Sequence, residues 1–332
     1  MAMKKFINDP RNLVSELLEG FALVHSSKIR LAGSNLVVRA KPKPASKVAV
    51  MTLGGSGHEP ALSGFVGEGM LDISVPGEIF AAPGPPRCLE ALKMLDRKAG
   101  VLFIVLNHAG DVMTANLTME MARKQGLNVM RIDTHEDISS GSSNAEDRRG
   151  LVGSVPVMKV AGAAAEAGRS LDDVAAIAQR LERNMATLAV ALTPATHPST
   201  GQAIFELADD EMEVGMGQHG EAGTGRSKIK TADETAELML DPLLSFLKIK
   251  PGEEILVLLN GAGATTLMEL FIVFRRVSQL CRSKGIKVVR AAADEFLTVQ
   301  EMAGFQMCIA RMDAELLRLW DAPCDTPYLV VR

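Results

Sequence analysis

The sequence has few aromatic residues, no cysteines at metal-ligand spacing and no long apolar segment. Aromatic residues make up 4% of the chain and Trp320 is its single tryptophan, so aliphatic side chains and methionine must fill the core. None of the four cysteines belongs to a CxxC pattern, which excludes the usual zinc and disulfide frameworks and predicts a reducing cytoplasm. No apolar run reaches the roughly 18 residues of a membrane span, and the first residues lack the apolar stretch of a signal peptide.

Positive charge is not in excess either. Lysine and arginine number 36 against 40 acidic residues, and the net charge of −4 argues against nucleic acid as a partner. Hydrophobic residues form 47% and charged residues 23% of the chain, which is the composition of an ordinary soluble globular protein. The 332 residues exceed the roughly 250–300 that one hydrophobic core usually holds. Two domains are therefore expected, over residues 1–185 and 186–332.

Strand and helix patterns alternate along the chain, which predicts βαβ units and mainly parallel sheets. Short apolar runs predict strands over residues 48–52, 101–106, 127–132, 154–159, 187–192, 254–259, 286–290 and 307–311. Apolar residues at helical spacing predict helices over residues 10–28, 86–98, 115–124, 161–168, 170–185 and 265–284. The expected fold class is therefore α/β, with two α/β domains.

The first candidate site follows the predicted strand 48–52 and reads Leu-Gly-Gly-Ser-Gly-His-Glu-Pro over residues 53–60. In parallel α/β sheets, ligands bind beyond the carboxyl ends of strands. Glycine at this place lets backbone N–H groups approach a ligand, and Ser56 and His58 add polar side chains. The loop lacks the GK[ST] ending of a Walker loop and the GxGxxG pattern. A tight glycine turn is the alternative, and His58 favours a site.

Two further loops carry candidate chemistry. Asp111 follows the predicted strand 101–106, where it is either a general base for a substrate hydroxyl or a cap of the next helix. Residues 215–223 place four glycines around His219, whose neutral imidazole nitrogen is a nucleophile for a carbonyl carbon. The acidic residues of segment 209–213 fit no EF-hand spacing, so we expect a solvated loop and no metal site.

These loops, together with further motifs, resemble the ketose-binding subunit family of dihydroxyacetone kinases. The matching segments are residues 55–60, 77–80, 107 with 110–111, 159–166, 219–221, 260–261, 301–304, 321–323 and 325–327. They follow one another from near the first residue to the last few, so the resemblance covers the whole chain. It implies a two-domain α/β subunit that forms a homodimer, with the substrate pocket between the domains.

The resemblance also implies a role for each candidate residue. His219 corresponds to the histidine that forms a hemiaminal with the ketone carbon of dihydroxyacetone. His58 and Asp111 correspond to the residues that contact the substrate hydroxyls and handle the proton during phosphoryl transfer. Gly55, Ser56 and Gly57 correspond to the loop that lines the same pocket. These six residues form the predicted site.

No cofactor is expected in this chain, because the family takes its phosphoryl group from a separate nucleotide-binding subunit. That partner uses ATP, or a bound ADP rephosphorylated by the phosphotransferase system, with Mg²⁺. We expect that the helical nucleotide-binding domain, which is fused behind this unit in single-chain kinases, is not part of this protein. No nucleic acid and no membrane are expected as partners.

The sequence departs from the family pattern at two positions. Leu53 replaces the first glycine of a longer glycine run, and Leu106 replaces a lysine often found before Asn107. Loss of that cation would weaken stabilisation of the transferring phosphoryl group or reshape the pocket for another ketose. The predicted function is a glycerone-kinase-type phosphotransferase subunit. The alternatives are a kinase subunit for a four-carbon ketose, and a non-catalytic sensor or coactivator; the presence of both His58 and Asp111 favours catalysis.

Overall fold

The computed structural model describes residues 5–221 and 223–332, and these divide into two compact units. Among the described residues, unit 1 comprises residues 5–134, Ser154–Arg180 and Glu315–Arg332, and unit 2 comprises His135–Gly153 and the described residues of Leu181–Ala314. Two units were expected, but a single boundary after residue 185 is not what the contacts give. The chain enters unit 2 briefly at His135, and its last residues return to unit 1. Such returns depend on contacts between residues far apart in the sequence, which local patterns do not report.

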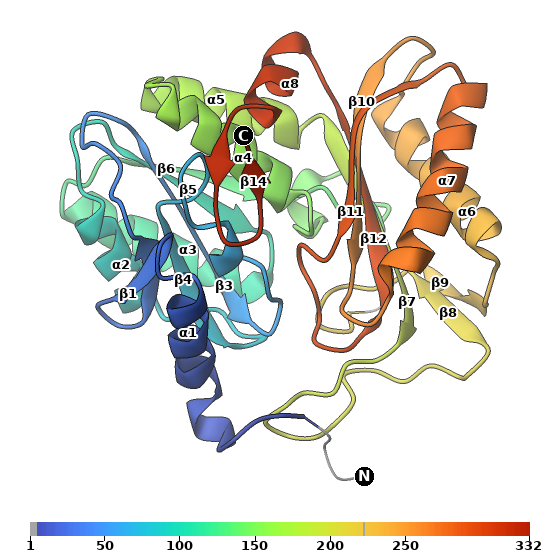
Figure 1. Cartoon of the computed structure of the whole chain (residues 1–332), viewed down its shortest axis with the longest axis horizontal. Helices are drawn as coiled ribbons and strands as arrows, with labels where there is room; N and C mark the ends of the chain where they lie inside the picture. Colours follow the sequence, from blue (N-terminus) through green and yellow to red (C-terminus); the bar gives the residue numbers. More distant parts are fainter. Residues whose placement is uncertain (1–4, 222) are drawn as a thin grey trace. The chain divides into compact units, whose positions relative to one another are not determined.

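The sheet of unit 1 has six strands in the order β1-β2-β4-β3-β5-β6 (Figure 1). The strands are β1 (Ile29–Ala32), β2 (Leu36–Arg39), β3 (Ala49–Ser56), β4 (Ile73–Ile79), β5 (Val101–Leu106) and β6 (Val129–Thr134). The four strands from β4 to β6 pair in parallel, whereas β1 and β2 form an antiparallel hairpin at one edge. The expected parallel α/β arrangement is confirmed in this unit. Because β3 and β5 are parallel neighbours, their carboxyl ends lie at the same edge of the sheet.

Helices cover both faces of this sheet. They are α1 (Leu13–Val24), α2 (Pro85–Met94), α3 (Ala109–Lys124), α4 (Ser154–Glu166) and α5 (Leu171–Glu182), with α8 (Ala314–Trp320) near the carboxyl end. Alternate strand residues such as Met51 and Phe103 pack with α2 and α3 in one apolar cluster. Their neighbours in the strands, Val50 and Leu102, are also fully buried, as a sheet covered on both faces requires. The small strands β13 (Cys324–Asp325) and β14 (Val330–Val331) pair with each other.

The strand predicted over residues 154–159 is wrong, because these residues begin α4. Every residue of α4 from Ser154 to Ala165 is buried, so its apolar pattern has no polar face that would reveal the helical period. Even Lys159 is fully buried, and its Nζ donates to the carbonyl oxygens of Leu319, at 2.9 Å, and Ala322, at 2.7 Å. Burial lowers the pKa of Lys159. These bonds attach the last segment of the chain to α4.

Unit 2 contains a second six-stranded sheet, in the order β11-β10-β12-β7-β8-β9. Its strands are β7 (Met185–Thr193), β8 (Glu211–Val214), β9 (Gly225–Lys228), β10 (Glu254–Gly261), β11 (Lys287–Asp294) and β12 (Ala303–Arg311). Only β10 and β11 pair in parallel, so the mainly parallel pairing expected here is corrected. The apolar runs predicted the strands, but the direction of pairing depends on how the connections return to the sheet.

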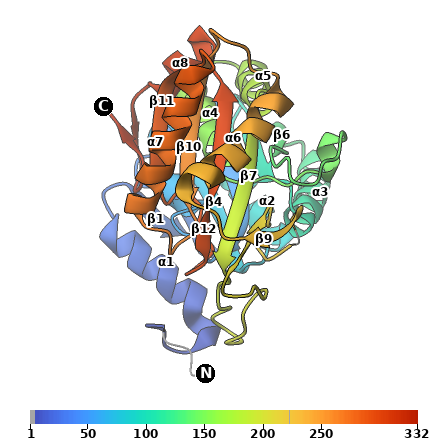
Figure 2. The ribbon, with the colours of Figure 1, turned by 90° about the vertical axis from the view of Figure 1, so that its right-hand side faces the viewer.

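Two helices, α6 (Ala232–Leu247) and α7 (Leu267–Ser283), lie side by side against the sheet of unit 2 (Figure 2). Each begins with a capping box, formed by Thr231 with Glu234 in α6 and by Thr266 with Glu269 in α7. Their apolar sides pack on alternate residues of the central strands in one continuous core. Within the described part of the chain, no helix combines the length and apolar character needed to cross a membrane.

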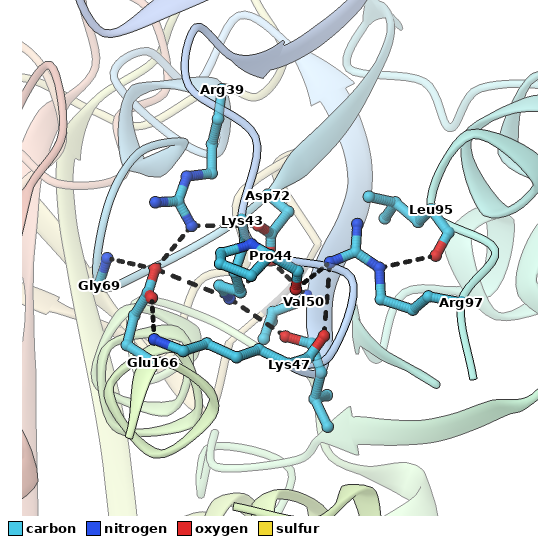
Figure 3. Close-up of polar contacts among 11 residues, drawn as sticks. Arg39, Lys43, Pro44, Lys47, Val50, Gly69, Asp72, Leu95, Arg97 and Glu166 are labelled. Carbon is cyan, nitrogen blue, oxygen red and sulfur yellow. Dashed lines mark hydrogen bonds and ion pairs between the residues drawn. The ribbon is translucent and has the colours of Figure 1, made fainter. Parts of the chain in front are cut away.

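A buried cluster of charged side chains joins three segments of unit 1 (Figure 3). Asp72 accepts hydrogen bonds from Lys43 Nζ at 2.8 Å, from Arg39 Nη1 at 3.1 Å and from the Val50 N–H at 2.8 Å. Glu166, at the end of α4, accepts from Arg39 Nη1 at 2.6 Å and from Lys47 Nζ at 3.5 Å. The Lys43 side chain has no exposed surface, so its charge is stabilised by these carboxylates and not by water.

Candidate active site

The glycine loop predicted as a site extends from the end of β3 and is held against residues 77–83. Ser56 Oγ donates to the carbonyl oxygen of Gly77 at 2.7 Å. A Cβ at Gly55 would lie 2.8 Å from the backbone nitrogen of Ala81, so the close approach of the two segments needs glycine there. Gly57 has a φ of +96°, a conformation that also favours glycine. The loop therefore has one well-defined conformation, in which larger residues at Gly55 and Gly57 would not fit without strain.

His58 lies directly after these glycines and is 6% exposed. Its ring centroid is 5.1 Å from that of Phe80, at an interplanar angle of 41°. The Phe80 N–H donates to the Ser56 carbonyl oxygen at 2.8 Å, which holds Phe80 beside the loop. Glu59 accepts from the Gly57 N–H at 2.9 Å, and burial raises the pKa of Glu59. The His58 imidazole is thus fixed by packing on one side and by the glycine turn on the other.

Asp111 is the third residue of α3, whose first residue is Ala109, so the helix begins six residues earlier than predicted. The N-cap position belongs to His108 and not to Asp111. Asp111 is 8% exposed and stands in the first turn of the helix, where the positive end of the helix dipole favours a carboxylate. The capping interpretation had required Asp111 at the N-cap. Its position instead presents a carboxylate at the carboxyl edge of the unit 1 sheet.

Residues 77–83 connect the glycine loop with the start of α3. Thr114 Oγ1 donates to the Pro83 carbonyl oxygen at 3.0 Å, and a Cβ at Gly110 would lie 3.5 Å from the Ala82 Cβ. The same segment contacts the glycine loop through Phe80. The structure therefore brings His58 and Asp111 to one edge of unit 1, with residues 77–83 packed against both loops. Residues 77–80 match the family motif, but the sequence alone did not place them at the site, although Gly77 was a signal of close packing.

His219 lies in unit 2, in the turn between β8 and β9, and its side chain is 28% exposed. Glu221 binds it twice: Oε2 accepts from the His219 N–H at 2.8 Å, and Oε1 lies 3.1 Å from Nδ1. An ionised Glu221 only accepts hydrogen bonds, so it places the imidazole proton on Nδ1 and the lone pair on Nε2. Glu221 belongs to the matching motif 219–221, and its place two residues after His219 was the signal that could have assigned it this contact.

The two departures from the family pattern are both buried. Leu53 is fully buried in β3 and belongs to the apolar cluster under α2 and α3. Leu106 is the last residue of β5 and is 4% exposed. Leu53 thus adds apolar packing within the strand before the glycine loop begins. Leu106 places an aliphatic side chain at the edge where Asp111 lies.

The acidic segment 209–213 pairs with basic residues of β9. Asp210 Oδ2 accepts from Lys228 Nζ at 2.5 Å, and the hydrogen bond lowers the pKa of Asp210. Glu213 accepts from the Gly223 N–H at 2.7 Å and from Arg226 Nε at 3.3 Å. These side chains therefore stabilise the ribbon of β8 and β9. The expected solvated loop is wrong for Glu211–Val214, because these residues form β8 and Glu213 is only 5% exposed.

A cavity of about 390 Å³ in unit 1 lies between α1 and the glycine loop. Leu17, Phe21 and Tyr328 line it together with Gly55 and Ser56. His58 and Asp111 do not line it, so of the six predicted site residues only Gly55 and Ser56 face this cavity.

The fold and the two loops define a class of protein. It is a two-unit α/β protein that carries a histidine paired with a glutamate on a glycine-rich turn, and a second histidine and a carboxylate at the carboxyl edge of a parallel sheet. Residues 19–328 match the family described as the Dak1 domain. The chain therefore belongs to the Dak1 family.

Relatives of similar length and longer relatives both match. The chain is 37% identical over 331 residues to the PTS-dependent dihydroxyacetone kinase 2, dihydroxyacetone-binding subunit DhaK, of Listeria innocua, which covers 99% of this chain and 100% of that protein. It is 37% identical over 326 residues to the D-erythrulose kinase of Mycolicibacterium smegmatis, covering 98% of this chain and 56% of that one. The solved structure of the dihydroxyacetone kinase operon co-activator Dha-DhaQ has a TM-score of 0.90 at 30% identity, covering 95% of this chain and 98% of that one.

Proposed function

We propose that this chain is the ketose-binding subunit of a dihydroxyacetone-kinase-type phosphotransferase and that it holds a short ketose covalently on His219. The observation that carries the proposal is the double contact of Glu221 with His219, which leaves Nε2 as the nucleophile. The full-length similarity to a dihydroxyacetone-binding subunit supports the same conclusion.

The covalent step follows from this geometry. The Nε2 lone pair forms a bond to the ketone carbon, and the π electrons of the carbonyl move to its oxygen, which takes up a proton. The imidazole gives up the Nδ1 proton, for which Glu221 is the adjacent acceptor. The product is a neutral hemiaminal, so the proton count is unchanged. Holding the ketose by a bond fixes its orientation and removes much of the entropic cost of the later phosphoryl transfer.

For the transfer step we propose Asp111 as the base for the attacking hydroxyl and His58 as a contact to the substrate hydroxyls. Gly55, Ser56 and Gly57 would line the pocket with backbone groups. An alcohol is a poor nucleophile, so a positioned carboxylate assists as the bond to phosphorus forms. Asp111 suits this role because the buried strand β5 and the first turn of α3 hold its backbone.

The phosphoryl donor would come from a separate nucleotide-binding subunit that carries ATP, or ADP, with Mg²⁺. The sequence has neither a Walker loop nor a kinase signature of its own. We place the protein in a reducing cytoplasm, because its four cysteines are free and buried. Burial raises the pKa of Cys88 and of Cys308 to about 12, so these thiols have no nucleophilic role.

A second candidate is a non-catalytic coactivator that binds the same ketose. The similarity to the Dha-DhaQ co-activator favours it, as does Leu106 in place of a cation beside the site. The similarity to a D-erythrulose kinase favours a four-carbon ketose as substrate. The presence of both His58 and Asp111 still favours catalysis, since adduct formation needs only the His219 loop.

The proposal is tested with dihydroxyacetone and erythrulose labelled with ¹³C at the ketone carbon. We expect the ketone signal to give way to a hemiaminal carbon signal on the protein, and a phosphorylated ketose to form when a nucleotide-binding subunit and its donor are added. His219→Ala should abolish the adduct, whereas His197→Ala, a histidine in a surface turn, should keep it. An adduct without phosphoryl transfer would favour the coactivator, and the absence of any adduct would exclude both functions.

We also propose that the protein forms a homodimer through the outer edge of β11. After an irregularity at Val288 to Arg290, the five residues Arg290–Asp294 pair regularly with β10, and β11 is an edge strand of this sheet in the described part of the chain. If two copies pair antiparallel about Ala292, Arg290 of each lies opposite Asp294 of the other. The pairing is then self-complementary in charge, and the central alanines permit close approach.

Apolar residues beside this edge support the same surface. Arg276 of α7 pairs with Glu237 of α6 and so marks the side of α7 that faces α6. Leu267 and Phe271 lie on the opposite side of α7 and are 46% and 57% exposed. An exposed strand edge next to exposed apolar side chains is usually covered by another chain.

Charge reversal tests this interface. Arg290→Glu should place like charges opposite each other and shift the protein towards monomer in sedimentation velocity, by about tenfold or more in the dimer dissociation constant. Combining it with Asp294→Arg should restore the dimer, because the pairs are then reversed in both copies. Arg123→Glu, an exposed charge on α3, serves as the control. If all variants sediment alike, β11 is not the interface.

A further inference from the structure

Arg149 contacts both ends of the turn that carries His219. Its Nη2 donates to the Gly215 carbonyl oxygen at 2.7 Å, and its Nη1 lies 3.5 Å from the Glu221 carbonyl oxygen. The same guanidinium donates through Nε to Asp137 Oδ2 at 2.7 Å and through Nη2 to Ser139 Oγ at 2.6 Å. One planar cation therefore connects residues 137–139 with residues 215–221. All of these residues belong to unit 2.

The segment 137–139, to which Arg149 is bonded, is held in place by its own hydrogen bonds and by burial. Asp137 is 1% exposed and Ser139 is 6% exposed, and the Ser139 N–H donates to Asp137 Oδ1 at 2.9 Å. The Asp137 N–H donates in turn to the Arg149 carbonyl oxygen at 3.0 Å. At Gly215, a Cβ would lie 2.5 Å from the Ser139 Cβ, so the turn packs directly on this segment.

Gly217 makes room for Arg149 beside the carboxylate that binds His219. A Cβ at Gly217 would lie 2.3 Å from Arg149 Nη1 and 2.2 Å from Glu221 Oε2. Arg149 Nη1 and Glu221 Oε2 thus lie on either side of the position that a Cβ at residue 217 would occupy, and a side chain there would displace one of these two atoms. Oε2 is the oxygen that accepts from the His219 N–H, so a shift of Glu221 changes how the imidazole is held.

We propose that Arg149 is a positioning residue that holds the 215–221 turn and its Glu221 carboxylate in the arrangement that keeps the imidazole proton of His219 on Nδ1 and makes Nε2 the nucleophile toward a ketone. The expected effect on ketose binding rests on the proposed function, whereas the contacts of Arg149 with the 215–221 turn are present without substrate. Arg149 touches neither the ketose nor the reacting atoms in this proposal. It acts through the backbone of Gly215 and Glu221 and through its charge beside Glu221 Oε2. The planar fork matters, because three of its nitrogens serve different partners.

Three variants separate this role from a general stabilising one. Arg149→Met removes the cation and its bonds, Arg149→Lys keeps the charge but cannot bond three partners in one plane, and Gly217→Ala leaves Arg149 intact but fills the point between it and Glu221. The control is Arg148→Met, which removes the neighbouring cation that stacks on Phe246 at 5.0 Å. Circular dichroism verifies that each variant is folded.

The first readout is the tautomer of His219, observed by ¹⁵N NMR of the imidazole without ketose. The native protein and Arg148→Met should give the form with the proton on Nδ1, whereas Arg149→Met and Gly217→Ala should give a mixture of tautomers. The second readout is ketose binding, which should weaken by about 10–100-fold in Arg149→Met and Gly217→Ala, as is typical when the support of a reactive histidine is lost. Arg149→Lys should lie between them and the native protein. Turnover at saturating ketose should change much less than the binding.

Retention of the Nδ1 tautomer and of ketose binding in both Arg149→Met and Gly217→Ala would overturn the inference. If Arg149→Met does not fold, Gly217→Ala decides, because Arg149 then keeps its bonds to Asp137. If the native protein forms no adduct, the proposed function fails, while the tautomer measurement still tests the role of Arg149.

Discussion

Asp111→Asn should lower kcat for ketose phosphorylation by about 10²–10⁴-fold, the usual contribution of general-base assistance. Asparagine keeps the size and one hydrogen-bonding oxygen of the side chain but cannot take a proton. The His219 adduct should form normally in this variant, because the hemiaminal depends on the turn in unit 2. A steady-state assay with saturating partner subunit, together with the ¹³C adduct signal, measures both properties in the same preparation.

The matched control is Glu120→Gln on the same helix, an exposed residue that pairs with Lys124 at 2.6 Å. It should keep native turnover. Near-normal turnover in Asp111→Asn would leave Asp111 as a structural residue of the first turn of α3 and would remove the proposed base. His58→Asn should weaken ketose binding as well as turnover, since His58 belongs to the rigid glycine loop.

Asp72→Asn should destabilise the protein by about 3–5 kcal/mol, which is typical when one partner of a buried ion pair is removed. Asp72 is 4% exposed and accepts from Lys43, Arg39 and the Val50 N–H (Figure 3). The amide keeps the shape but leaves the fully buried Lys43 ammonium without its nearest carboxylate. Urea unfolding followed by circular dichroism measures the loss. Replacing both partners, with Asp72→Leu and Lys43→Met, should recover part of it, because no unpaired charge is then buried.

The same cluster predicts how stability depends on pH. Burial opposes ionisation of Glu166, but Lys43 and Arg39 outweigh it and lower the pKa of Glu166 below its ordinary value of 4.5. A carboxyl group with a lowered pKa stabilises the fold fully above its unfolded pKa, and this contribution is lost as the pH falls through the folded value. The native protein should therefore lose stability as the pH falls below about 4.5, and the part of this loss that comes from Glu166 should be absent in Glu166→Gln. Asp210→Asn, which breaks the exposed pair with Lys228, should change stability little. A large effect of this variant would contradict the expectation that buried ion pairs affect stability more than exposed ones.

Local patterns in the sequence determined most of the elements and the positions of the site loops. The run Val101–Leu106 forms β5 as predicted, because six consecutive apolar residues ending at polar ones suit a strand buried on both faces. The glycine loop, Asp111 and His219 were all proposed as site residues from residue type and position alone. The resemblance assigned the chain to its family, because motifs along the whole sequence agree with it.

Sequence patterns gave wrong predictions where the same run of residues fits both a strand and a helix. The apolar run that begins α4 reads equally well as a strand, since burial on all sides removes the polar face of the helix. The predicted start of α3 was late because Ala109, Gly110 and Asp111 carry no apolar periodicity. The strands β1, β2, β4, β8 and β9, the short strands β13 and β14, and the helices α6 and α8 were not predicted at all.

By itself, then, the sequence determined the α/β class and the family and singled out His219 as the candidate nucleophile, because these depend on residue types and short-range spacing. Only the tertiary structure decided the antiparallel pairing in unit 2, the return of the last residues to unit 1 and the support behind His219. Arg149 reaches Gly215 across 66 residues of sequence and Glu221 across 72. No local period connects residues so far apart, and their contact depends on how the sheet of unit 2 places the two loops beside each other.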